Sequence, residues 1–186
     1  LITDGIRAIA NGIRDLANRF IEFGKTGIEF NKSMEQYSTP IKAILYDDVE
    51  GANQLIDSMR KLSKTSVFDV TSLLSASQQL VASEVSAKDA EAAITNLAKS
   101  LAYAGKSDDE LRRMAQNLNQ IKNAGKATAQ DLKQFVYAGV PIYKLLADYS
   151  DEFNSISKST VVTFEDITGA LALAGEEGGR FFDAFD

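Results

Sequence analysis

The spacing of apolar residues is the feature of this sequence that most restricts its fold. The chain contains only two prolines, Pro40 and Pro141, and its apolar side chains recur at intervals of three and four residues rather than alternating with polar ones. A period near 3.6 indicates amphipathic helices, which frequent prolines would interrupt. The sequence therefore predicts an all-α fold. The apolar stripes predict a helical core whose members include Val49, Leu73, Leu97, Leu118, Phe135, Val136 and Leu173.

Helix starts and ends are marked by local motifs. A capping box, in which Ser or Thr is followed three residues later by an acidic residue, satisfies backbone N–H groups of the first helical turn. Five such pairs precede apolar runs: Ser66 and Asp69, Ser86 and Asp89, Ser107 and Glu110, Thr128 and Asp131, and Thr163 and Asp166. Glycines that can close a helix in the left-handed conformation follow four runs, at Gly105, Gly125, Gly139 and Gly175. These signals predict short helices joined by short loops.

The first 46 residues carry a heptad pattern instead. From Ile2 to Ile44 apolar residues alternate at steps of four and three, interrupted only by Gly27. The start of this seam consists of Ile2, Ile6, Ile9, Ile13, Leu16, Phe20 and Phe23. Sustained heptads are typical of coiled coils, and Ile at both seam positions favours three or four strands. We predict a long helix over 1–46 that self-associates or packs against 47–186 of its own chain, and both remain open. Pro40 is expected to kink or end this helix.

Composition excludes several classes of function. The chain has no cysteine or histidine, which removes disulfides, thiolate zinc sites, thiol nucleophiles and imidazole catalysis. Its net charge of −6 argues against a nucleic-acid surface, which needs clustered positive charge. No segment has the roughly 18 consecutive apolar residues of a membrane span, and the N-terminal residues lack the basic flank and apolar block of a signal peptide. We expect a soluble, unsecreted protein. Because the sequence starts at Leu1 rather than Met, we also expect it to be part of a longer chain.

No reaction centre is predicted. Gly105-Lys106-Ser107 resembles the end of a phosphate-binding loop, but Ser100 stands where the first glycine should be and a helical pattern precedes it. The acidic clusters lack the spacing of cation-binding loops. We therefore predict no catalytic residue, no cofactor and no metal. The two parts, a compact helical domain over 47–186 and the long helix over 1–46, favour a structural or interaction module.

Several short motifs stand in a recognisable order along the chain. The most specific are Leu118-Asn119-Gln120-Ile121, Ala124-Gly125-Lys126, Asp131-Leu132-Lys133-Gln134, Ala138-Gly139-Val140-Pro141 and Gly178-Gly179-Arg180-Phe181-Phe182. This ordered set resembles the N-terminal conserved domain of the tape measure proteins of long-tailed bacteriophages and prophages, over about residues 30–185. Two departures occur. Val67 stands where the family tends to have proline. Glu84 stands where it often has glycine, so the turn before Ser86 is expected to differ in shape.

The resemblance implies a virion structural protein that sets tail length and nucleates assembly of the tail tube. It would act in the host cytoplasm during assembly and then lie in the lumen of the tail. The partners it implies are tail-tube protein, tail assembly chaperones, tail-tip or baseplate proteins, and other copies of the same chain as a homo-oligomer. The alternative is a cellular helical adaptor or signalling module that uses residues 1–46 as a coiled-coil stalk.

Overall fold

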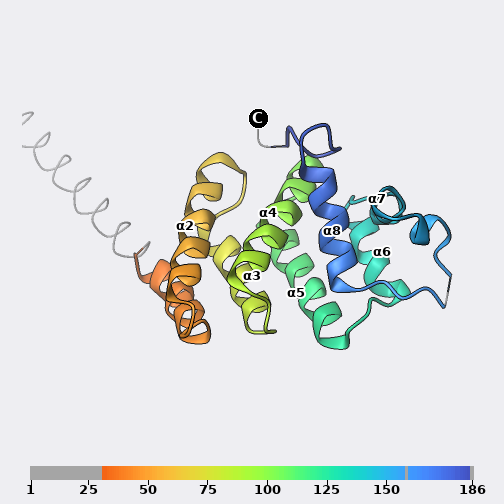
Figure 1. Cartoon of the computed structure of the whole chain (residues 1–186). Coiled ribbons are helices and arrows are strands. Elements are labelled where there is room, and N and C mark those ends of the chain that lie inside the picture. The colour runs from red at the N-terminus through yellow and green to blue at the C-terminus, as the bar shows by residue number, and fades with distance from the viewer. Residues whose placement is uncertain (1–30, 158, 185–186) are drawn as a thin grey trace, which may run out of the picture. The chain divides into compact units, whose positions relative to one another are not determined.

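The computed structural model describes residues 31–157 and 159–184 (Figure 1). Within these residues every regular element is a helix, which confirms the predicted all-α class. The helices are α2 (Val49–Thr65), α3 (Val70–Val81), α4 (Ala87–Tyr103), α5 (Asp108–Ala124), α6 (Ala129–Tyr137), α7 (Ile142–Tyr149), the 3-10 helix η1 (Asp151–Ser155) and α8 (Phe164–Gly175). Residues 31–44 are also helical, so Pro40 lies inside a helix rather than at its end. The seam residues Ile2 to Phe23 lie outside the described residues.

Tyr37–Asp186 forms a compact unit of its own. In this unit α4 packs against α2 and α8, and α8 packs in turn against α7. A second row is formed by α3, α5 and α6, with α5 between the other two. The core lies between the rows, where Leu73, Leu97, Leu118 and Phe135 are fully buried. The predicted division of the chain at residue 46 stays a prediction.

The predicted helix starts differ in how completely their caps form. Thr128 and Thr163 make full capping boxes with Asp131 and Asp166, and the Ser86 hydroxyl accepts the Asp89 N–H. Ser107 precedes α5 but its side chain makes no capping bond. The prediction at Ser66 was wrong. Asp69 is the N-cap of α3, and Ser66 instead ends α2.

The predicted helix ends are largely correct. Gly105, Gly125 and Gly139 have φ angles of 67°, 73° and 81°, in the left-handed region that favours glycine. The prediction that Gly175 closes a helix in this way was wrong. Gly175 is the last residue of α8, and the left-handed glycine that follows is Gly178. Glu84 also has a positive φ of 64°, so the turn before Ser86 holds the left-handed conformation without glycine.

Candidate partner-docking edge

Four connecting segments lie at the same end of the helices. The backbone N–H of Asp69, just before α3, donates to Asp108 Oδ1 at the start of α5 over 2.9 Å. A Cβ added to Gly139 would lie 3.0 Å from Cβ of Ala104. The rings of Tyr103 and Phe181 have centroids 5.2 Å apart. We call this set of segments the loop edge, and the α2–α3 loop and the 176–184 turn lie along the upper side of Figure 1. It comprises residues 66–69, 103–107, 138–141 and 176–182.

The motif Ala138-Gly139-Val140-Pro141 forms the turn between α6 and α7. The N–H groups of Gly139 and Val140 donate to the carbonyls of Val136 and Phe135, both at 2.9 Å, which closes the end of α6. Ala138 and Val140 are buried, whereas Gly139 is exposed. Pro141 then precedes α7, where its carbonyl accepts from the N–H of Lys144 at 2.9 Å. The motif therefore reverses the chain within four residues and presents Gly139 at the loop edge.

The motif Gly178-Gly179-Arg180 forms a second tight turn, after α8. Gly178 has a φ of 79°, and a Cβ at Gly179 would lie 2.6 Å from the carbonyl oxygen of Ala174. The turn brings Phe181 back so that its N–H donates to that same Ala174 oxygen at 2.7 Å. Phe181 is thereby buried beneath Tyr103, and Arg180 is left exposed.

A hollow of about 480 Å³ lies between α7, α8 and this turn. Its lining includes the apolar residues Leu145 and Leu173 and the charged residues Asp148, Glu176, Glu177 and Arg180. Leu173 was predicted to be core, but its side chain is 43% exposed because it faces this hollow. Val49 and Val136 were predicted to be core as well and are likewise exposed. Apolar side chains, three carboxylates and one guanidinium thus line the hollow.

Residues 25–185 match the family described as tape measure protein. The chain belongs to this family. The match covers most of the sequence and confirms the resemblance drawn from the ordered motifs. No curated protein and no solved structure matches the chain. Tape measure proteins are structural components of phage tails, and the chain accordingly has a tape measure role in the virion tail.

The tape measure motifs are only partly brought together. Ala138 to Pro141 and Gly178 to Arg180 both lie at the loop edge. Gly139 lies beside Ala104, and the ring of Tyr103, the last residue of α4, contacts that of Phe181, which follows Arg180. Gly125 lies elsewhere, because it caps the opposite end of α5, about 25 Å from Asp108 along a helix of this length. The predicted self-association seam lies outside the described residues.

The described surface carries several exposed ion pairs. Two pKa shifts among the described residues belong to such pairs: a hydrogen bond to Asp109 raises the pKa of Arg112, and one to Lys122 lowers the pKa of Glu165. Among the described residues no group of three or more Asp or Glu is arranged to hold a metal ion. No described helix is long and apolar enough to cross a bilayer. Exposed aromatic residues such as Tyr46 and Tyr137 lie outside the loop edge, and those within it are Tyr103, which is 64% exposed, and Phe182, which is 42% exposed. Sequence periodicity missed these two, since aromatic residues at helix ends give no separate signal.

Proposed function

We propose that this part of the tape measure protein docks assembly partners in the phage tail and does not itself measure length. The observation that carries the proposal is the repeated reversal of the chain. A continuous helix of 150 residues would span ~225 Å, whereas a packed domain of that size has a radius of gyration of about 15 Å. The longest helices described here have 17 residues, and each is followed by a turn. Length would then be encoded in other parts of the tape measure chain.

The partners we propose are tail-tube protein, tail assembly chaperones and tail-tip or baseplate proteins. The loop edge is the proposed contact surface, because it holds two family motifs beside exposed aromatic residues, and aromatic side chains are enriched at protein interfaces. The family match favours this tail role over the cellular adaptor. Setting tail length and nucleating the tail tube belong to the same proposal, with this domain acting in initiation.

In-frame deletions in the complete tape measure gene test the division of labour. Deletions in helical sequence beyond residue 186 should shorten tails by ~1.5 Å per residue removed. Deletions of whole helices within 47–186 should abolish or derange tail assembly without a graded change in length. Electron microscopy of tails measures both. Graded shortening from deletions within 47–186 would show that this domain is part of the ruler.

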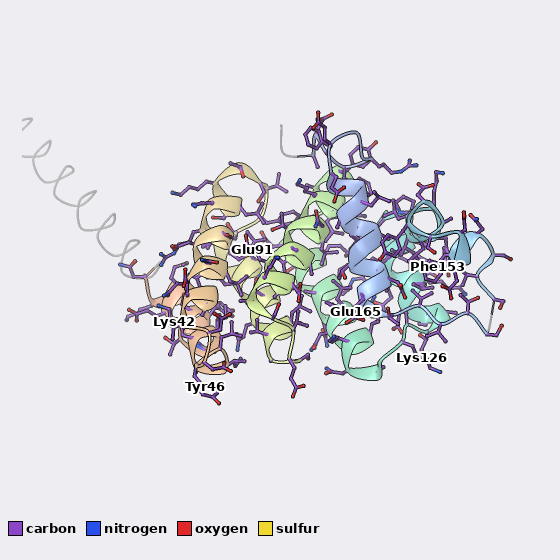
Figure 2. All side chains as sticks on the ribbon, in the orientation of Figure 1. Lys42, Tyr46, Glu91, Lys126, Phe153 and Glu165 are labelled. Carbon is purple, nitrogen blue, oxygen red and sulfur yellow. The ribbon has the colours of Figure 1, made fainter. Side chains whose placement is uncertain are left out.

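A paired variant tests the loop edge without removing any helix. Replacing Tyr103 and Phe182 by Asp should reduce tail yield while the circular-dichroism spectrum is kept. Tyr46→Asp is the control, because Tyr46 is 77% exposed and lies before α2, at the other end of that helix from the loop edge (Figure 2). Equal tail yields from the two variants would contradict a docking role for the loop edge.

We further propose that residues 1–46 form a homo-oligomer through the heptad seam. The motive is the length of the seam, whose apolar stripe needs a partner surface. Ile9→Asp combined with Ile13→Asp should lower the molecular mass measured by sedimentation, while the helicity of the chain outside residues 1–46 is kept. A fragment that is already monomeric at high concentration would favour packing of this helix within its own chain.

A further inference from the structure

We draw no further inference here: the strongest candidate, the hollow of about 790 Å³ between α6, the start of α7 and the loop that joins η1 to α8, is lined by Leu132, Tyr143 and Val161, but nothing in the structure shows what covers it.

Discussion

Removal of the Thr163 cap should destabilise the whole domain. The Thr163 hydroxyl accepts the Asp166 N–H at 3.2 Å, and Asp166 Oδ2 accepts the Thr163 N–H at 2.8 Å. Both bonds are partly buried. The helix that they start, α8, buries Phe164, Ile167 and Leu171 against α4 and α7. Its first turn therefore cannot fray without exposing core, so Thr163→Ala should lower the free energy of global unfolding.

The expected loss is about 1 kcal/mol, within the range of ~0.5–2 kcal/mol measured for N-cap replacements. Loss of the methyl group of Thr163 is small beside this, because the bond to Asp166 is the larger change. For a domain of this size, 1 kcal/mol corresponds to a fall in Tm of roughly 2–4 °C. Urea unfolding followed by circular dichroism measures the free energy directly, with an unchanged slope showing that the folded and unfolded states are otherwise the same.

Ser107→Ala is the matched control. Ser107 occupies the same position before α5 and belongs to the same sequence motif, but its side chain makes no capping bond. Its replacement should change the free energy of unfolding by less than ~0.5 kcal/mol, as for other surface substitutions. A loss at Ser107 equal to that at Thr163 would show that the sequence motif, rather than the observed hydrogen bonds, determines stability, and would refute the reasoning.

Two further predictions concern the turns and the ion pairs of the same unit. Gly139→Ala should lower the free energy of unfolding by roughly 1–2 kcal/mol, because an alanine at this positive φ is strained. In urea unfolding it should cost more than Gly105→Ala, because a Cβ at residue 139 would lie 3.0 Å from Ala104 whereas nothing lies within 4 Å of one at residue 105. Lys122→Met should cost up to ~1 kcal/mol at pH 7, because Lys122 lowers the pKa of Glu165 below its ordinary value of 4.5 in the folded state. A lowered pKa stabilises the fold above the unfolded-state pKa, and this contribution is lost as pH falls through the folded-state pKa of Glu165. The difference from the natural chain should therefore shrink in acid to what Lys122 gains from the Phe164 ring, whose centroid lies 5.2 Å from its Nζ; a difference that does not shrink would place the effect outside the ion pair.

The helices could be predicted from sequence where their signals are local. The capping bonds of Thr128 and Thr163 join residues three apart, so spacing alone identifies them. Ser66 has the same spacing but fails, because its hydroxyl accepts the N–H of Phe68, and Phe68 is buried. The N–H of Asp69 is then taken by Asp108, 39 residues away. A contact at that separation leaves no periodic trace in the sequence, so the start of α3 was misplaced.

The loop edge shows the same limit at a larger scale. Its motifs were recognised as short stretches in order, but their meeting depends on contacts between Gly139 and Ala104 and between Tyr103 and Phe181. The positive φ angles of Gly139 and Gly178 account for glycine at both positions on backbone grounds alone. No such requirement accounts for the exposure of Tyr103 and Phe182, since burial of aromatic surface is favourable. The glycines therefore shape the loop edge, whereas the exposed aromatic residues are where a partner would gain binding energy.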